Sequence, residues 1–325
     1  MAAVKALEFL APGIVTSVQD LGRYGYGRYG VAPSGALDSF ALRIANLLVG
    51  NSEGQACLET MLMGPGIRVL TDVVIAVTGG NLQPKKNKQP IEMWRSHAFQ
   101  KDDVLSFGNA INGFRAYIAV GGGFDLPRVM DSRSTNLPSG FGGLQGRMLK
   151  KGDFLSAGGT AAGLKQDGQH IFPSDWIPQY SDQWTLRVIW GPQDDHFPEG
   201  SRQAFSNSTY TMSQDSDRTG IRLEGPQVVC RSDIEASIIS EGVISGSIQI
   251  PGDGKPIIIL GETVTGGYRK IATVTSADLP LLGQIKPGDG IEFEAVSLNE
   301  AHRAFQETED RIDKFKRSIS GALLL

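Results

Sequence analysis

Apolar residues occur in short runs along this chain, and turn residues separate the runs. Runs of β-branched and aromatic residues bounded by Gly, Pro, Asn or Asp are typical of β-strands. The clearest examples are residues 67–70, 73–77, 104–107, 114–120 and 184–190. Residues 4–18 predict further short strands, interrupted at Pro12-Gly13. The pattern therefore predicts a mainly β protein.

Helical periodicity is clearest in two segments. The first has apolar residues at helical spacing, namely Leu37, Phe40, Ala41, Ile44, Leu47 and Leu48. Gly50-Asn51 is a helix stop signal. We expect Ser34 to cap the start, with Asp38 in the first turn, although free N–H groups there could instead hold an anion. Asn46 is expected to make buried hydrogen bonds. The second segment is the C-terminal helix, where Ser297 and Glu300 form a capping box.

Three similar turns suggest related meanders in the two halves of the chain. Each has Lys and Asp before a strand, at residues 101–105, 151–155 and 286–291. Residues 157–183 contain Gly158-Gly159, then polar residues, then Pro173 and Pro178, and this composition predicts an interdomain linker. We predict an N-terminal domain at residues 1–160, a linker at 161–183 and a C-terminal domain at 184–325, which includes the terminal helix.

Composition excludes several classes of function. The 325 residues carry a net charge of −4, so no basic surface for nucleic acid is expected. The 41 Gly and 16 Pro fit a turn-rich β architecture. No apolar run approaches the roughly 18 residues that span a membrane. Two distant cysteines and no visible signal peptide predict a cytoplasmic protein with reduced thiols.

Metal and nucleotide motifs are not found. The four histidines, at positions 97, 170, 196 and 302, lack the spacing of metal ligands, so no metal site is expected. His196 follows Asp194-Asp195, where a solvated turn is favoured over an acid/base group. The chain has neither a phosphate-binding P-loop nor a Gly-x-Ser-x-Gly elbow.

Polar residues interleaved with glycine mark the candidate chemistry. Carboxylate and guanidinium groups on glycine loops can bind small polar ligands, or can simply hold the loops in shape. Near the N-terminus the candidates are Gln19, Asp20 and Arg23; in the middle they are Arg133, Ser134 and Thr135, before the glycines at 140–143. In the second half they are Asp217, Arg218, Gln249, Thr265, Gly266 and Tyr268.

Taken together, these motifs resemble the biotin-dependent carboxyltransferase family, which includes allophanate hydrolase subunit 2, the C subunit of 5-oxoprolinase and the Kip antagonist. The matching motifs lie at residues 16–23, 35–38, 45–51, 58–59, 132–135, 142–147, 216–223 and 265–268. Three details depart from the family pattern. The run 261–265 lacks a glutamine, Arg269 replaces a proline, and Thr219 replaces a methionine.

The resemblance implies two cyclophilin-like β-barrel domains with a few helices. It also implies a subunit of an ATP-dependent 5-oxoprolinase. That enzyme would hydrolyse 5-oxo-L-proline with two partners, a B-type subunit of 5-oxoprolinase (the allophanate hydrolase subunit 1 type) and a LamB/YcsF-type protein. No cofactor is expected to be covalently bound, and ATP would be used by the complex. On this view Asp20, Arg133, Asp217 and Arg218 are catalytic or anchoring residues. The other candidates would bind substrate.

Two alternatives stay open. The chain could be the carboxyltransferase component of a urea carboxylase, with carboxybiotin supplied by a partner, since the sequence has no biotinylation motif. It could instead be a non-catalytic regulatory module that binds a subunit 1-like partner. A chain of this length favours the 5-oxoprolinase interpretation, because the urea enzymes of the family are commonly fused.

Overall fold

Strands make up most of the regular secondary structure, and their bounds follow the apolar runs of the sequence. The computed structural model describes residues 4–158, 170–235 and 237–321. The predicted strands at 67–70, 73–77, 104–107, 114–120 and 184–190 all form, which confirms the mainly β prediction. The cyclophilin-like barrel form of the domains stays a prediction.

The chain divides into two compact units. The first unit comprises the described residues up to Arg23, those between Ser34 and Tyr180, and those from Arg311 onward. The second comprises residues 24–33 and the described residues between Ser181 and Asp310. Part of the predicted linker, residues 161–169, lies outside the described residues, and the predicted domain limits stay a prediction.

The first unit contains two antiparallel sheets. One has the strand order β11-β1-β4-β9-β6-β7 and the other the order β2-β3-β10-β5-β8. Their strands are β1 (Val4–Ala11), β2 (Val15–Gln19), β3 (Cys57–Met61), β4 (Gly66–Val69), β5 (Val73–Asn81), β6 (Lys85–Lys86), β7 (Gln89–Pro90), β8 (Ser96–Phe99), β9 (Val104–Ser106), β10 (Asn112–Val120) and β11 (Phe154–Ala157). A short 3-10 turn, η2 (Ser174–Trp176), follows β11.

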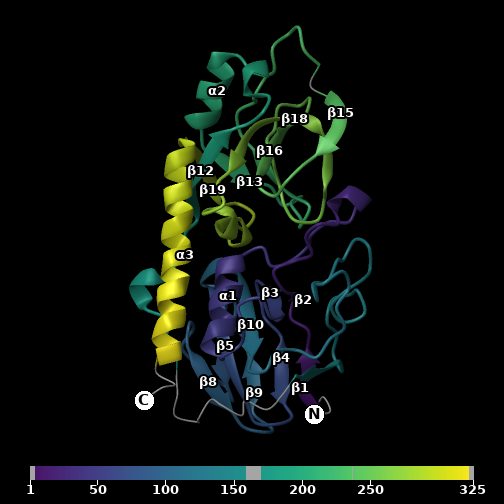
Figure 1. Ribbon diagram of the computed structural model, residues 1–325, viewed down its shortest axis with the longest axis vertical. Helices are drawn as coiled ribbons and strands as arrows, with labels where there is room; N and C mark the ends of the chain where they lie inside the picture. Colours follow the sequence, from purple (N-terminus) through teal and green to yellow (C-terminus); the bar gives the residue numbers. More distant parts are fainter. Residues whose placement is uncertain (1–3, 159–169, 236, 322–325) are drawn as a thin grey trace. The chain divides into compact units, whose positions relative to one another are not determined.

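The sequence of strand β10 is apolar without alternation because both faces of the strand are buried. Ala116, Ile118 and Val120 pack in a core shared by both sheets, whereas Tyr117 and Ala119 face a second core. Successive side chains of a strand point to opposite faces, so a strand buried on both faces must be apolar throughout. Helix α1 (Ser39–Leu48) supplies the second core and packs on β5 and β10 (Figure 1).

The start of α1 corrects one expectation. Asp38, not Ser34, is the N-cap, and its Oδ1 accepts a hydrogen bond from the N–H of Ala41 at 2.8 Å. Ser34 lies outside the helix with φ of 54°, and its hydroxyl accepts from Arg23. Asn46 is buried and donates to the carbonyls of Leu42, Glu53 and Gln55, as predicted.

Each of the three Lys/Asp turns contains the same type of hydrogen bond. In each, a carboxylate accepts from the backbone N–H three residues earlier, which closes the turn. The pairs are Asp103 with Gln100 at 2.8 Å, Asp153 with Lys150 at 2.7 Å and Asp289 with Lys286 at 3.1 Å. This shared contact confirms the predicted turn in both halves of the chain.

The second unit has one eight-stranded sheet, in the order β12-β19-β13-β14-β17-β16-β18-β15, and β18 also pairs with β12. Its strands are β12 (Gln183–Trp190), β13 (Tyr210–Met212), β14 (Gly220–Glu224), β15 (Ser237–Gly242), β16 (Ser247–Ile250), β17 (Ile257–Ile259), β18 (Thr265–Val274) and β19 (Gly290–Ala295). Its helical segments are η1 (Gly27–Tyr29), η3 (Asp194–His196), α2 (Glu199–Ser206) and η4 (Leu279–Gly283).

Helix α3 (Leu298–Gly321) is the second predicted helix. Ser297 and Glu300 form the expected capping box: the N–H of Ser297 donates to Glu300 at 2.8 Å, and the N–H of Glu300 donates to the Ser297 hydroxyl at 3.3 Å. Ile312 and Phe315 are buried in the core that contains α1. Within the described parts of the chain, the structure has no helix with the length and apolar character needed to cross a membrane.

Candidate functional site

Asp20 joins two distant loops of the first unit. Its Oδ1 accepts from the N–H of Gly22 at 2.8 Å and from the hydroxyls of Ser132 and Ser134 at 2.7 and 2.6 Å. Its Oδ2 accepts from the backbone N–H of Arg133 at 2.5 Å. Four protein donors thus surround a buried carboxylate. A carboxylate held this way fixes loop geometry, so the structure favours a positioning role for Asp20.

Arg23 is also part of the loop framework. It is 2% exposed, and its Nη1 donates to the Ser34 hydroxyl at 2.9 Å. Its Nη2 donates to the backbone carbonyl of Ser134, and its guanidinium lies 4.7 Å from the centre of the Phe141 ring. A cation over an aromatic face adds to these hydrogen bonds. Arg23 therefore holds the middle loop and is shielded from solvent.

The glycines of the middle loop are required by close backbone approach. Gly142 has φ of +73°, and a Cβ there would lie 2.1 Å from the carbonyl oxygen of Ser134. A Cβ on Gly143 would lie 2.0 Å from the Thr135 hydroxyl. Glycine alone fits both positions. The chain can thus fold the loop tightly around Ser134 and Thr135.

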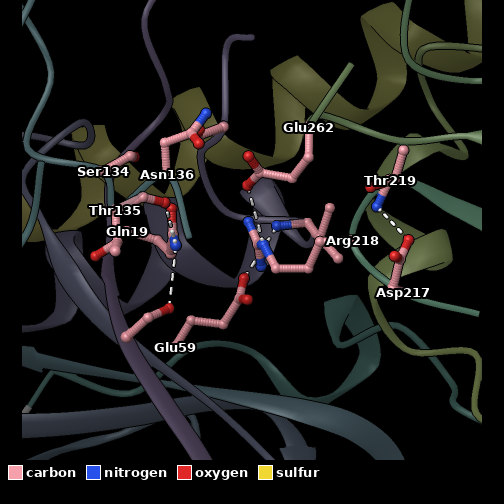
Figure 2. Close-up of polar contacts among 12 residues, drawn as sticks. Gln19, Glu59, Ser134, Thr135, Asn136, Asp217, Arg218, Thr219 and Glu262 are labelled. Carbon is pink, nitrogen blue, oxygen red and sulfur yellow. Dashed lines mark hydrogen bonds and ion pairs between the residues drawn. The ribbon is translucent and has the colours of Figure 1, made fainter. Parts of the chain in front are cut away.

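Gln19 and Thr135 link strand β2 to the same loop. The Gln19 amide nitrogen donates to the Ser17 hydroxyl at 3.0 Å and to the Thr135 carbonyl at 3.2 Å, and Figure 2 shows Gln19 beside Thr135. Thr135 donates twice to the Val18 carbonyl, from its N–H at 2.9 Å and its hydroxyl at 3.0 Å. The Oε1 of Gln19 is buried and has no hydrogen-bond partner in the described part of the chain. These contacts position Thr135, which follows Ser134.

Arg133 differs from its neighbours in offering cationic N–H groups. Its backbone is fixed by Asp20, and its Nε donates to the Leu126 carbonyl at 2.8 Å. No acceptor for its two terminal nitrogens is found among the described residues, and its side chain is half-buried. A guanidinium with free, oriented N–H groups suits a carboxylate. Arg133 is therefore the anion-binding candidate of the first unit.

Arg147, also in the middle motif, is engaged elsewhere. Its Nη1 and Nη2 bind the two oxygens of Asp153 at 2.7 and 2.9 Å. This hydrogen bonding with Arg147 lowers the pKa of the Asp153 carboxyl. Asp153 closes one of the three Lys/Asp turns, so the pair supports that turn.

Asp217 and Arg218 occupy the turn before β14 in the second unit. The exposed Asp217 accepts from the N–H groups of Thr219 at 2.7 Å and Gly220 at 3.2 Å. Arg218 forms an ion pair with Glu262 at 3.2 Å, and the Glu262 side chain is fully buried (Figure 2). Sequence reasoning missed Glu262, although it stands in the run 261–265 where the family pattern departs.

Gln249 and Gly266 meet between neighbouring strands. Gln249 on β16 is buried, and its amide nitrogen donates to the Tyr268 carbonyl on β18 at 3.3 Å. A Cβ on Gly266 would lie 2.3 Å from that nitrogen. The predicted residues Gln249, Gly266 and Tyr268 are thus brought together. Thr265 is exposed at the start of β18 and pairs with Gly242 of β15.

Lys270 and Glu241 add a charged pair that sequence reasoning missed. Lys270 lies opposite Gln249 in the sheet, and its side chain is only 8% exposed. Its ammonium bonds to Oε1 of Glu241, which also accepts from the Gln193 amide at 2.9 Å. The hydrogen bond with Lys270 lowers the pKa of Glu241. Strand alternation from Gly266 through Tyr268 was the signal that could have identified Lys270.

Arg269 points away from this pair. It donates from Nε to the Glu235 carbonyl at 2.7 Å and from Nη1 to Nδ1 of His196 at 2.7 Å. Because arginine stays protonated, Nδ1 of His196 must be the acceptor, which places the imidazole proton on Nε2. The turn that contains His196 therefore packs against β18.

Comparison with known proteins identifies the family. Residues 29–295 match the family model for the carboxyltransferase domain, subdomain A and B. The chain is 36% identical over 302 residues to the C subunit of 5-oxoprolinase from Escherichia coli, and the match covers 93% of this chain and 94% of that protein. It is also 36% identical over 319 residues to urea amidolyase of Saccharomyces cerevisiae, covering 94% of this chain but 17% of that protein.

A solved structure gives the same result. The urea carboxylase of Kluyveromyces lactis superposes with a TM-score of 0.89 and 34% identity, over 97% of this chain and 29% of the other. The resemblance inferred from the sequence motifs is thus confirmed along nearly the whole chain. This chain belongs to the biotin-dependent carboxyltransferase family.

Proposed function

We propose that this chain is one component of an ATP-dependent 5-oxoprolinase, which hydrolyses 5-oxo-L-proline to L-glutamate. The observation that carries the proposal is the match to the C subunit of 5-oxoprolinase, which covers 93% of this chain and 94% of that protein. The match to urea amidolyase instead covers 17% of a much longer chain. Nearly all of the 5-oxoprolinase subunit is thus represented in this chain, whereas most of urea amidolyase is not.

Opening the lactam ring sets the chemical requirements. Water adds to the ring carbonyl, the C–N bond breaks, and the nitrogen takes a proton to become the amine of glutamate. Hydrogen-bond donors must stabilise the oxygen as it gains negative charge, and a cation must hold the substrate carboxylate. The terminal N–H groups of Arg133 suit that carboxylate. Asp20, Ser134, Thr135, Gln19 and Arg23 hold the loop that presents Arg133.

The second unit has candidate contacts of its own. Gln249, Thr265, Gly266 and Tyr268 lie on adjoining strands, where amide, hydroxyl and backbone groups can contact a small ligand. Asp217 and Arg218 stay candidates on a neighbouring turn. Asp217 accepts from the Thr219 N–H and Arg218 pairs with Glu262, so both side chains help to hold that turn in shape.

We propose that the enzyme is an assembly. The bacterial relatives carry the name of a single lettered subunit of 5-oxoprolinase, and this name supports the presence of partner subunits. A B-type subunit of 5-oxoprolinase (the allophanate hydrolase subunit 1 type) and a LamB/YcsF-type protein are the proposed partners. ATP would be used by the complex, and this chain would bind no cofactor covalently. A cytoplasmic location goes with this proposal.

Carboxyl transfer is the second candidate, and the TM-score of 0.89 to a urea carboxylase supports it. In that case carboxybiotin would be supplied by a partner. A ureido ring carries N–H donors and a carbonyl acceptor, and the Gln249 amide and Tyr268 hydroxyl are groups that can pair with both. The two candidates therefore differ in the partner and the substrate.

Reconstitution tests the choice. The assay would measure glutamate release and ATP hydrolysis with 5-oxo-L-proline, this chain and both partners, and would omit each protein in turn. We expect release to require this chain and to fall at least tenfold with Arg133→Ala. Arg128→Ala is the matched control, because Arg128 is exposed on the same loop region and has no described partner. A stable complete complex without turnover would contradict the proposal, and carboxyl transfer to urea would be tested next.

A further inference from the structure

We propose that the Glu241–Lys270 pair is a recognition site for a cis amide edge, meaning an N–H and a C=O on the same side, as in a lactam or a cyclic urea. This inference rests on the proposed function for its choice of natural substrate. It concerns neutral amide recognition by side chains to which neither the family motifs nor the sequence candidates give a role.

The register of three strands builds the site. Glu241 of β15 lies opposite Gly266 of β18, and Lys270 of β18 lies opposite Gln249 of β16. Gly266 and Lys270 are four residues apart on one strand and share a face. Gly266 has no side chain, so the Gln249 amide packs over that position. A Cβ there would press on the Gln249 amide, at 2.3 Å from its nitrogen.

The pair keeps a carboxylate oxygen as an acceptor and ammonium N–H groups as donors for a ligand. Oε1 of Glu241 accepts hydrogen bonds from the Lys270 ammonium and the Gln193 amide, whereas Oε2 has no hydrogen-bond partner among the described residues. An ammonium has three N–H donors, and Lys270 directs one of them to Glu241. The Glu241 side chain is 44% exposed, so the acceptor is accessible. A carboxylate oxygen and an ammonium N–H thus lie side by side.

Charge decides the class of ligand. The pair is neutral overall, and an incoming carboxylate would meet the exposed charge of Glu241 as well as the buried charge of Lys270. A neutral group that both donates and accepts is the better complement. In the hydrolysis reaction that group is the ring amide.

Amide geometry then selects rings. A secondary amide in an open chain is trans, so its N–H and C=O point in opposite directions, and the cis form costs free energy. A five-membered ring holds the amide cis without that cost. A ring amide, unlike a trans secondary amide, can therefore donate to Glu241 while accepting from Lys270. The ring of 5-oxoproline and the ureido ring of biotin share this edge.

The test uses neutral probes and the full chain without partners. Equilibrium titrations followed by NMR shifts of the Gly266 and Gly267 amides would compare 2-pyrrolidinone and 2-imidazolidinone with N-methylacetamide. We expect the cyclic probes to bind at least tenfold more tightly. Glu241→Gln and Lys270→Met should each weaken binding of the cyclic probes by about tenfold, the loss expected for one hydrogen bond to a charged group.

Lys255→Met is the matched control, since it breaks another Lys–Glu pair of the same unit, with Glu224 at 2.5 Å on the surface. It should leave probe binding unchanged. Circular dichroism would check that each variant is folded, and the largely exposed Glu241 provides the variant expected to fold most readily. Equal binding of cyclic and open-chain probes, no binding, or pair variants that behave like Lys255→Met would each overturn the inference.

Failure of the inference and failure of the proposed function give different results. Probe binding that depends on the pair, without glutamate release by the complete complex, would reject only the proposed function. Glutamate release that is unaffected by Glu241→Gln and Lys270→Met would reject only the inference.

Discussion

The backbone N–H of Arg133 donates to Oδ2 of Asp20 at 2.5 Å, across 113 residues of sequence. The other oxygen of the same carboxylate, Oδ1, accepts hydrogen bonds from the hydroxyls of Ser132 and Ser134. One buried side chain thus fixes the backbone of the residue whose guanidinium is the anion-binding candidate. Changes at Asp20 should therefore act on stability and on the position of Arg133 together.

Asp20→Asn should destabilise the first unit. The substituted amide keeps one oxygen, but its NH₂ group would meet a donor, either the Arg133 N–H or the serine hydroxyls. Leaving a buried donor unsatisfied costs about 1–3 kcal/mol. Urea unfolding at neutral pH would measure the loss. Asp217→Asn is the control, because Asp217 is exposed, and it should cost much less. Equal effects of the two changes would contradict the positioning role.

Gly142→Ala should be far more harmful than Gly140→Ala. Both glycines have positive φ, +73° and +69°, so both alanines would carry the strain of about 1–2 kcal/mol for that conformation. At Gly142 the new Cβ would also lie 2.1 Å from the backbone oxygen of Ser134, whereas nothing lies within 4 Å at Gly140. Melting temperatures of the two variants would test this. Similar values would mean that the loop can relax around the methyl group.

Arg147→Ala should remove a pH-dependent part of the stability. Hydrogen bonding with Arg147 lowers the pKa of Asp153 in the folded state. A depressed folded pKa stabilises the protein above the unfolded value, near 3.9, and this stabilisation is lost as pH falls through the folded value. The stability difference between wild type and variant should therefore be full at pH 6 and shrink below about pH 4. A difference that stayed constant to pH 2 would contradict the assignment.

The two cysteines should differ in reactivity. Burial strongly raises the pKa of the Cys57 thiol, which is fully enclosed in the core of α1. Cys230 is partly exposed, and burial raises its pKa while the nearby Arg269 opposes that rise. Since the thiolate is the reactive form, native labelling should modify Cys230 slowly and leave Cys57 intact. Mass mapping after labelling at pH 8 would check this, and Cys57 should react only after unfolding.

Local patterns determined the elements of this fold. The apolar run at 114–120 became β10 because a strand buried on both faces needs apolar residues throughout. The Lys/Asp turns formed as predicted, since an Asp side chain can close a turn with a backbone N–H only three residues away. The helix stop after Leu48 and the capping box at Ser297 depend on equally short distances in the chain.

What only the tertiary structure decided were contacts between distant residues. The expected cap at Ser34 was wrong because Ser34 accepts from Arg23, so Asp38 caps α1. The roles of Asp20 and Arg133 depend on a pairing across 113 residues, and the Glu241–Lys270 pair depends on the register of β15 with β18. Periodicity reports which face of an element is buried, but it does not report which elements meet. That choice follows from packing and from the need to satisfy buried polar groups, which act only once the chain is folded.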